Sequence, residues 1–231
     1  MTVESIRTTA PRGAPVTLYY RNETSDLSVI FSTFSAWGAP PADEYGLRDV
    51  YVTGTALDIG AHVGTIAIAL LADNPECRVI AVEPLPENVE MIRRNVEANG
   101  FEDRCEVVWG AFGKATVTYG YEGAEIADNR YIGNLAIGSA YQHSVATVPV
   151  VTLSELIPDG AEFAKIDCEG CEWSALRDPA AHRIRHIIGE GHGSTRSYNW
   201  DQRIARLLRS THDVTIRRDD GGIGLFEAVA R

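Results

Sequence analysis

The sequence predicts an α/β fold with a mostly parallel sheet, helices on both faces and an antiparallel hairpin at the C-terminal end. From residue 53 onward, short apolar runs typical of buried strands alternate with helical patterns. A glycine turn, Gly60 to Gly64, joins the first of these strands to the first helix. Near the C-terminus, an Asp/Gly turn at 219–222 separates two strand patterns, which must then be antiparallel neighbours.

The composition is that of one globular domain. The 231 residues are 45% hydrophobic and 23% charged, enough for a single α/β core. The net charge of −11 argues against a nucleic-acid partner, because such proteins carry a basic face. No apolar run approaches the roughly 18 residues that a membrane span needs, and no signal-peptide pattern is present. We therefore expect a cytoplasmic protein with a small-molecule or peptide substrate and no membrane partner, with a homodimer as a possible assembly.

Residues 1–50 lack the regular rhythm of the rest and are predicted to form an N-terminal cap or substrate region. Within them, 16–20 has the pattern of a strand and 24–34 that of a helix. Residues 51–231 are predicted to form the main domain. Its first elements are expected to be a strand at 55–58, a helix at 65–72, a strand at 78–82, a helix at 86–99 and a strand at 105–109.

A long stretch, 110–144, follows without a helical pattern. It is rich in Gly, Ala and Tyr, and short alternating pieces such as 116–119 suggest hairpins. Because a loop of this length in a compact domain usually serves function, we expect it to cover the substrate as a lid.

Regular patterns return at residue 146. The capping box formed by Thr152 and Glu155 predicts a helix start, and the Asp178-Pro179 dipeptide predicts a helix end. The expected elements are a strand at 146–151, a short helix from 152, a strand at 163–167, a helix at 172–177, a strand at 184–189, a helix with Trp200, Ile204, Leu207 and Leu208 on one face, and hairpin strands at 213–217 and 223–230.

The glycine turn and a following acid predict an adenosine-type cofactor. Glu83 ends the second strand, where a carboxylate can accept hydrogen bonds from two ribose hydroxyls. A dinucleotide fingerprint would have the pattern G-x-G-x-x-G, whereas here Asp58 precedes Gly60 and Gly64. An acid at that point repels a pyrophosphate but suits a sulfonium or amine group. The pattern therefore favours S-adenosylmethionine over NAD.

Five successive strands are expected to end in polar or glycine residues, and in a parallel sheet these ends meet at one edge. In chain order they are Asp58 with Gly60, Glu83, Gly110 with Ala111, Asp167 with Glu169, and Glu190 with His192. This edge is the predicted site.

The segment 162–173, with K-I-D-C-E-G-C-E at its centre, and the motif E-P-x-P-x-N at 83–88 resemble the FkbM family of S-adenosylmethionine-dependent methyltransferases. The resemblance implies a Rossmann-like class I fold with a seven-stranded sheet, and mainly O-methylation of natural-product, sugar or lipid hydroxyls. It implies that Asp58, Gly60 and Gly64 line the methionine end of the cofactor and that Glu83 binds the ribose. It also implies that Asp167, Glu169 and Gly170 face the transferred methyl group. The predicted cofactor-binding residues are Asp58, Gly60, Ala61, His62, Gly64, Glu83, Pro84, Ala111 and Asp167. Two features depart from the family pattern: His62 replaces the usual Asn, and Cys168 and Cys171 replace apolar or small residues.

The predicted catalytic residues are Asp167, Glu169, Glu190 and His192. Because histidine has the unperturbed pKa best suited to a base near neutrality, His192 is preferred over His143 and the acids for removing the acceptor proton. Asp167 is predicted to orient the acceptor or cofactor. The alternative for the two histidines is a surface loop position, and for Asp167 and Glu169 it is capping of the next helix.

Several alternatives stay open. Asp167 and Glu190 should end adjacent strands and could hold Mg²⁺, although a metal-free reaction is favoured. Cys168 and Cys171 have redox or zinc spacing, but no second Cys/His pair lies nearby, so two partly buried thiols are expected. The nucleophile could also be a nitrogen or a carboxylate. Outside this class, a NAD-dependent oxidoreductase or a non-catalytic nucleotide-binding domain remains.

Overall fold

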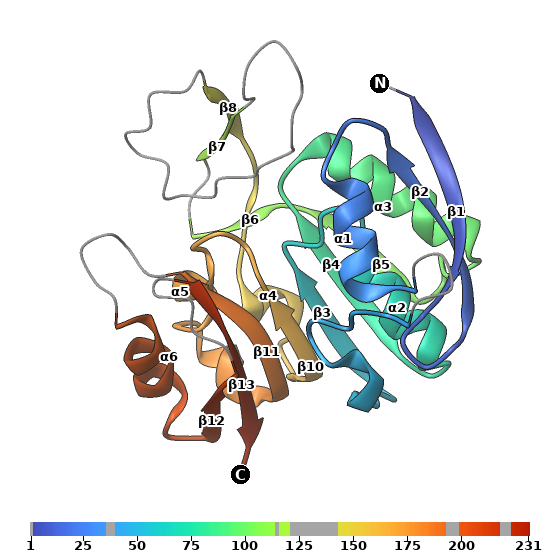
Figure 1. The fold of residues 1–231 in the computed structure, drawn as a ribbon. Helices are drawn as coiled ribbons and strands as arrows, with labels where there is room; N and C mark the ends of the chain where they lie inside the picture. The colour runs from blue at the N-terminus through green and yellow to red at the C-terminus, as the bar shows by residue number, and fades with distance from the viewer. Residues whose placement is uncertain (1, 36–39, 114–115, 121–142, 193–198, 218–222) are drawn as a thin grey trace.

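The computed structural model describes residues 2–35, 40–113, 116–120, 143–192, 199–217 and 223–231. Its centre is a seven-stranded sheet with the strand order β12-β13-β11-β10-β3-β4-β5 (Figure 1). The strands are β3 (Thr55–Ile59), β4 (Arg78–Glu83), β5 (Cys105–Trp109), β10 (Ala161–Ile166), β11 (Ile184–His192), β12 (His212–Ile216) and β13 (Ile223–Ala230). The first five of these pair in parallel, and β13 pairs antiparallel with both β11 and β12. The predicted mostly parallel sheet with an antiparallel C-terminal hairpin is confirmed.

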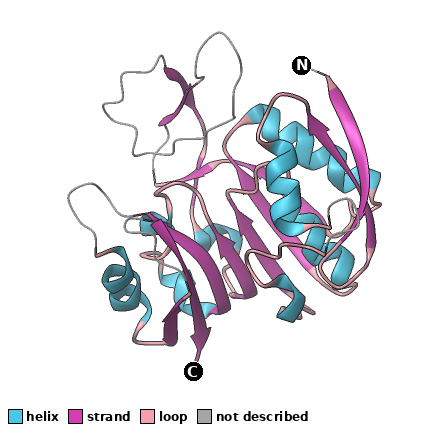
Figure 2. Cartoon of the chain, in the orientation of Figure 1, coloured by secondary structure: helices cyan, strands magenta, loops and turns pink. Residues whose placement is uncertain are grey.

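Helices cover both faces of this sheet (Figure 2). They are α1 (Asp26–Thr33), α2 (Thr65–Asp73), α3 (Pro86–Ala98), α4 (Leu153–Leu156), α5 (Glu172–Ala175) and α6 (Trp200–Leu208), with 3₁₀ turns at Leu47–Asp49 and Pro179–Arg183. Buried side chains of α1, α2 and α3 form one core with Ala56, and those of α4, α5 and α6 form another with Leu57. Neighbouring residues of β3 thus point to opposite cores, as the alternation of a strand requires.

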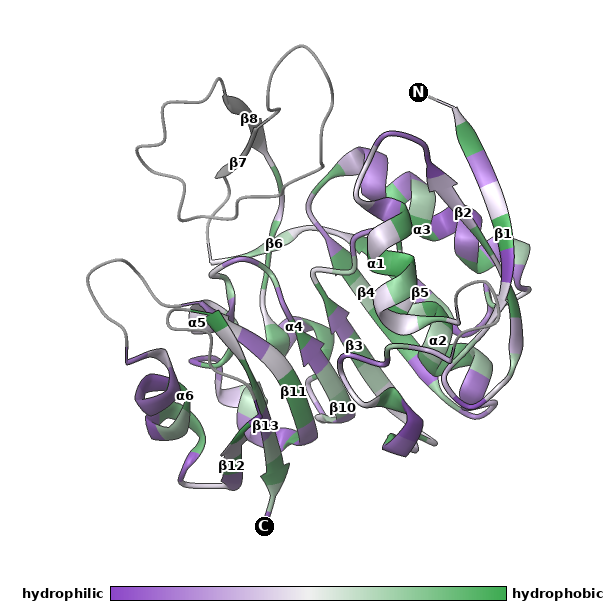
Figure 3. Ribbon diagram, viewed as in Figure 1, coloured by the Kyte–Doolittle hydropathy of each residue, from purple (hydrophilic) through white to green (hydrophobic). Residues whose placement is uncertain are grey.

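Sequence patterns explain where several helices lie. Pro86 begins α3, since proline fits the first turn of a helix, and Gly100 follows its end with φ +68°. The predicted capping box of Thr152 and Glu155 is present at α4. Helix α6 has one hydrophobic and one hydrophilic side (Figure 3). Its buried residues are Trp200, Ile204 and Leu208. Among the described residues, every helix is too short or too polar to span a bilayer.

The N-terminal segment forms a separate hairpin, β1 (Val3–Thr9) with β2 (Pro15–Arg21), followed by α1. The predicted strand and helix are confirmed, whereas β1 was not predicted. Leu18 of β2 and Ile30 of α1 are fully buried and belong to the same core as α2. The division into a cap, 1–50, and a main domain stays a prediction.

The predicted lid, 110–144, lies largely outside the described residues. Strand β7 (Thr116–Gly120) pairs antiparallel with β8 (His143–Thr147), in agreement with the expected hairpin character. The expected single strand at 146–151 is wrong: β8 ends at Thr147, and β9 (Val150–Val151) pairs instead with β6 (Ala111–Phe112). Pro149 lies between the two strands, and proline has no N–H to donate to a ladder.

Two other predicted boundaries are corrected. The helix expected at 172–177 ends at Ala175. The strand expected to end at Gly189 continues to His192, because its partner β13 pairs as far as His192 with Ile223. Glu190 and His192 therefore lie inside β11 rather than in a loop.

Candidate functional site

A cavity of about 380 Å³ lies at the carboxyl edge of the sheet. It is lined by residues from α1, the glycine turn and the ends of β4 and β10. Its lining residues are Ser25, Val29, Ser32, Thr33, Glu44, Tyr45, Gly60, Ala61, His62, Thr65, Ile66, Glu83, Asn88, Lys165, Asp167, Cys168 and Glu169. A narrow crevice of about 10 Å³ shares Gly60 and Cys168 with it. The cavity volume is within the range of small-molecule sites.

The glycine turn depends on backbone that other residues rarely adopt. Gly60 and Gly64 have φ of +75° and +86°, and His62 between them has φ +52°. A Cβ atom on Gly60 would clash with the carbonyl oxygen of Asp167, so this position requires glycine. The close approach of the turn to β10 brings Gly60 and Asp167 to the same cavity wall.

Glu83 is the buried acid of the cavity, with only 3% of its surface exposed. Its carboxylate accepts hydrogen bonds from the backbone N–H of His62 at 2.9 Å and of Leu85 at 3.1 Å, and from Nδ2 of Asn88 at 3.1 Å. Burial raises the pKa of Glu83 to about 7, although these three hydrogen bonds oppose the shift. The carboxylate is therefore held rigidly at the end of β4.

A chain of buried contacts connects Glu83 to the N-terminal segment. Arg21 donates from Nε and Nη2 to the Asp26 carboxylate at 2.8 and 2.9 Å, and from Nη2 to Oδ1 of Asn88 at 2.6 Å. Asn88 in turn donates to Glu83. Nε2 of His62 lies 3.7 Å from Asp26, but burial lowers the pKa of His62 to about 4, so the two do not form a charged pair near neutrality. Through Arg21, the N-terminal segment thus orients Asn88, which donates to Glu83.

Arg21→Lys should weaken binding of an adenosine cofactor by about tenfold. Lysine keeps the charge that Asp26 needs but cannot bond Asp26 and Asn88 with one planar group, so Asn88 loses its anchor. The dissociation constant for S-adenosylhomocysteine, measured by calorimetry, checks this. Arg7→Lys, on the exposed hairpin strand β1, is the control. Equal affinity in both variants would show that Asn88 needs no support.

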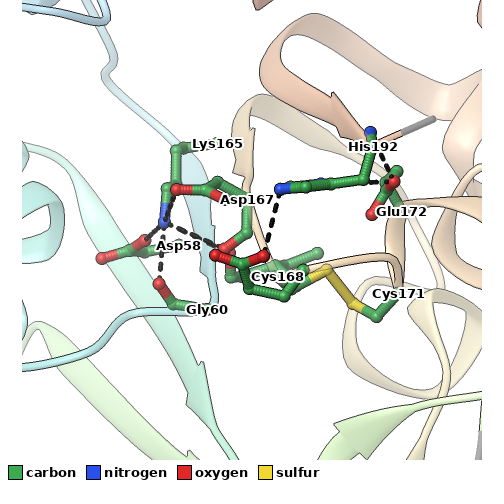
Figure 4. The surroundings of a disulfide bond; sticks show 10 residues. Asp58, Gly60, Lys165, Asp167, Cys168, Cys171, Glu172 and His192 are labelled. Carbon is green, nitrogen blue, oxygen red and sulfur yellow. Dashed lines mark hydrogen bonds and ion pairs between the residues drawn. A yellow bond between two sulfur atoms is a disulfide. The ribbon is translucent and has the colours of Figure 1, made fainter. Parts of the chain in front are cut away.

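Lys165 is a buried cation, 4% exposed, that ties the glycine turn to β10. Its Nζ donates to the carbonyl oxygen of Gly60 at 2.7 Å and lies 3.5 Å from Asp58 and 3.9 Å from Asp167 (Figure 4). Burial alone would lower the pKa of Lys165, but Asp58 and Asp167 outweigh it and raise the pKa. The hydroxyl of Tyr45 donates to Asp167 at 2.7 Å, which fixes that carboxylate from the cavity side.

Asp58 does not line the cavity, in contrast to its predicted place at the methionine end. It is fully buried, and its carboxylate accepts from the backbone N–H of Ala67 in α2 at 3.0 Å and faces Lys165. The position at which a strand ends does not by itself say whether the side chain points to the ligand or into the core. Here it points to the core and to the start of the next helix.

His192 lies behind the cavity rather than in it, and 5% of it is exposed. Its ring nitrogens are 3.3 to 3.4 Å from carboxylate oxygens of Glu169, Glu172 and Glu190. Burial would lower the pKa of His192, but Glu172 and Glu190 outweigh it and raise it to about 11. An imidazole that keeps its proton at neutral pH cannot accept another, so the structure argues against His192 as the base.

Glu169 is the acid of this group that reaches the cavity. It follows Asp167 in the turn after β10, has φ +54°, and its side chain is 46% exposed. Burial of the carboxylate is the largest cause that raises its pKa to about 7, and the neighbouring acids Asp167 and Glu190 add to it, while His192 opposes the shift.

Cys168 and Cys171 form a disulfide, so the prediction of two thiols is wrong. Both are more than nine-tenths buried, and their Cα atoms are 5.4 Å apart because the turn between them contains Glu169 and Gly170 with positive φ. The bridge closes the turn that carries Glu169. Spacing alone did not reveal this, since a disulfide requires the backbone to bring the two Cβ atoms together.

Reduction of this disulfide should lower the free energy of unfolding by about 2 kcal/mol, the chain-entropy value for a very short loop. Urea unfolding with and without reductant measures the change. The Cys168→Ser/Cys171→Ser variant should have the same free energy of unfolding with and without reductant. This control separates loss of the disulfide from effects of reductant on the free cysteines Cys77 and Cys105. A wild-type curve that reductant leaves unchanged would contradict the expectation.

The structure brings together some of the predicted site residues and not others. Gly60, Ala61, His62, Glu83, Asp167 and Glu169 line the cavity, and Pro84 and Ala111 line the adjoining crevice. Asp58, Gly64, Glu190 and His192 line neither. Sequence reasoning missed Tyr45, Asn88 and Lys165. Asn88 belongs to the motif at 83–88 and Lys165 to the motif within 162–173, so the motifs could have identified both as site residues. No pattern in the sequence indicated Tyr45.

Comparison with known proteins relates this sequence to methyltransferases. A family model described as the methyltransferase FkbM domain matches residues 58–214, more than half of the chain. The O-methyltransferase imqG of Aspergillus flavus is 38% identical over 56 residues, 24% of this chain and 23% of its own. The release factor glutamine methyltransferase of Escherichia coli is 42% identical over 41 residues, 18% of this chain and 15% of its own. The matches thus span less than a quarter of the length of these relatives.

The fold has relatives among solved structures. The precorrin-6y C5,15-methyltransferase from Geobacter metallireducens superposes with a TM-score of 0.50 at 12% identity, over 85% of this chain and 93% of its own. At this identity the likeness concerns the fold alone.

Proposed function

The chain belongs to the FkbM methyltransferase family, and from that premise we propose that it methylates a hydroxyl group of a small-molecule acceptor. The methyl donor is S-adenosylmethionine, which supplies an electrophilic methyl group when bound. The finer part of the proposal, O-methylation of a natural-product or sugar-like acceptor, rests on the family resemblance and on the O-methyltransferase of Aspergillus flavus matched over 56 residues.

The observation that carries the proposal is that three acids, from the carboxyl ends of two strands, line one cavity. Glu83 lines it at the end of β4, with an orientation fixed by three hydrogen bonds, and is suited to bind the ribose hydroxyls. Asp167 and Glu169 line it at the end of β10, where negative charge suits a sulfonium group. The residues present therefore fit S-adenosylmethionine.

Residues of the chain then have separate tasks. Tyr45 and Lys165 hold Asp167, which orients the acceptor hydroxyl in line with the methyl group. Glu169 accepts the hydroxyl proton, because its half-exposed carboxylate faces the cavity. Side chains of α1, among them Val29 and Ser32, also line the cavity and contact the acceptor. We also retain a cytoplasmic location and no nucleic-acid partner as parts of the proposal.

Cofactor affinity should fall as the pH is lowered through about 7. The pKa of Glu83 is raised to about 7 in the free protein, and the ribose hydroxyls need its carboxylate, so protonation competes with binding. Cofactor affinity should therefore be constant above about pH 7 and fall by about tenfold for each pH unit below it. Calorimetry with S-adenosylhomocysteine between about pH 5.5 and 8.5 measures the profile. A Glu83→Gln profile with the same slope would assign the pH dependence to another group.

Titration of S-adenosylmethionine, S-adenosylhomocysteine and NAD into the protein tests the cofactor. Binding of the two adenosyl ligands without NAD supports the proposal, and binding of NAD alone, or of nothing, would return the chain to an oxidoreductase or a nucleotide-binding module. A panel of matched acceptors carrying a hydroxyl, an amine or a carboxylate on one scaffold, read by mass spectrometry, then tests the nucleophile. Methylation of the amine or the carboxylate, but not of the hydroxyl, would contradict the proposal that the acceptor is a hydroxyl group.

A further inference from the structure

Three potential metal ligands converge just beyond the end of β10, beside the last residues of β11. Ile166 pairs with Gly189, so the next residues of the two strands, Asp167 and Glu190, are neighbours. Glu190 and His192 are two positions apart in β11 and lie on the same face of the strand. One ligand atom from each of Asp167, Glu190 and His192 lies within 4.8 Å of the others.

The charges around this point do not balance. Carboxylates of Glu169, Glu172 and Glu190 lie 3.3 to 3.4 Å from the ring of His192, and Asp167 belongs to the same cluster. Lys165 lies 3.9 Å from Asp167 and offsets that carboxylate, which leaves three acids around one imidazole. Because buried charge without compensation is costly, the cluster favours a further cation.

The imidazole of His192 is held as a metal-binding imidazole would be. Both ring nitrogens are buried and form no hydrogen bond of acceptable geometry with any described residue. Nδ1 lies 3.4 Å from the fully buried Glu172, which also accepts a hydrogen bond from the backbone N–H of His192 at 2.9 Å (Figure 4). Nε2 lies 3.3 Å from Glu169 and 3.4 Å from Glu190. A carboxylate at one nitrogen typically orients a histidine whose other nitrogen binds a metal. Nε2 is thus the nitrogen directed into the cluster.

We propose that Asp167, Glu190 and Nε2 of His192, which releases its proton as the metal binds, hold one first-row divalent cation such as Mn²⁺ beside the cavity. A mixed set of carboxylate oxygen and imidazole nitrogen suits such an ion better than Ca²⁺ or Mg²⁺, which prefer oxygen alone. The cation balances the surplus of acids and leaves Glu172 to orient His192.

The use of this cation rests on the proposed function. Asp167 lines the cavity, so a cation bound to it can coordinate the acceptor hydroxyl and increase its acidity. The O–H bond then breaks with its proton passing to Glu169, an O–C bond forms to the methyl carbon, and the S–C bond breaks with its electron pair leaving on sulfur. The products are a methyl ether and S-adenosylhomocysteine, and Glu169 releases the proton to solvent.

Titration of Mn²⁺ into the metal-stripped protein, without cofactor, tests the site. Free Mn²⁺ is followed by electron paramagnetic resonance, and heat by calorimetry. Wild type should bind one Mn²⁺ per chain, and Glu190→Gln and His192→Gln should each weaken binding by about tenfold or more. The control is Glu227→Gln, because Glu227 forms a similar pair with His186 of β11, at 2.8 Å, away from the cluster.

The outcomes separate this site from the proposed function. Absence of Mn²⁺ binding by wild type at millimolar concentration, or equal binding by Glu190→Gln, overturns the metal site even where S-adenosylmethionine binds. Mn²⁺ binding that depends on Glu190 supports it even where cofactor binding fails. Thermal unfolding reports whether His192→Gln folds; where it does not, Glu190→Gln decides alone, since Glu190 is only partly buried.

Discussion

Lys165→Met should lower the free energy of unfolding by about 3–5 kcal/mol, the range for removing one partner of a buried ion pair. Methionine fills a similar volume, so the loss arises from charge. Asp58 is fully buried and would lose the cation 3.5 Å away, and the carbonyl of Gly60 would lose its hydrogen bond. Urea unfolding at neutral pH measures the difference.

Two variants make this result specific. Asp58→Asn combined with Lys165→Met removes the buried carboxylate that has lost its partner. The double variant should recover much of the lost free energy of unfolding, because a neutral pair in the core costs far less than a single ion. Arg185→Met, an exposed cation of β11, should change the free energy by less than about 0.5 kcal/mol. A single Lys165→Met variant as stable as the double variant would mean that Asp58 is neutral in the folded protein.

Glu83→Gln should weaken binding of S-adenosylmethionine by roughly a hundredfold, about 3 kcal/mol. The neutral amide keeps the shape but loses charge-assisted hydrogen bonds to two ribose hydroxyls, each worth about 1.5–3 kcal/mol. Calorimetric titration of S-adenosylmethionine and S-adenosylhomocysteine measures the loss, which should be similar for both because they share the ribose.

The control for this loss is Glu87→Gln, an exposed acid in the first turn of α3. It removes the same charge near the site without touching the cavity, so its affinity should match wild type. Thermal unfolding should show that Glu83→Gln is folded, since burial raises the pKa of Glu83 and a neutral side chain avoids that cost. A Glu83→Gln protein that binds normally would assign ribose recognition elsewhere.

Some features follow from local sequence because local physics governs them. Gly60 needs a backbone conformation and an absence of Cβ that no other residue supplies, so it marks the turn directly. The period of apolar residues gave the position of α2 and α3 within one or two residues. The strands β12 and β13 had to pair in antiparallel fashion because only a short stretch of sequence separates them.

Other features depend on partners that are distant in the chain. Strand β1 is mostly exposed and shows no buried face, so its pattern is weak until β2 pairs with it. Strand β11 extends to His192 because β13, more than thirty residues later, continues the ladder. The disulfide of Cys168 and Cys171 required the turn that the positive φ of Glu169 and Gly170 creates.

The sequence by itself determined the fold class, the family and the edge of the sheet on which the acids gather, because periodicity, glycine positions and two motifs are local signals. Only the tertiary structure decided which acids face the cavity. Asp58 and Glu83 both lie at the carboxyl ends of parallel strands, yet Asp58 turns to Lys165 in the core and Glu83 to the cavity. The direction of a side chain depends on its partners, and those partners, Lys165 for one and Asn88 with Arg21 for the other, meet only when the chain has folded.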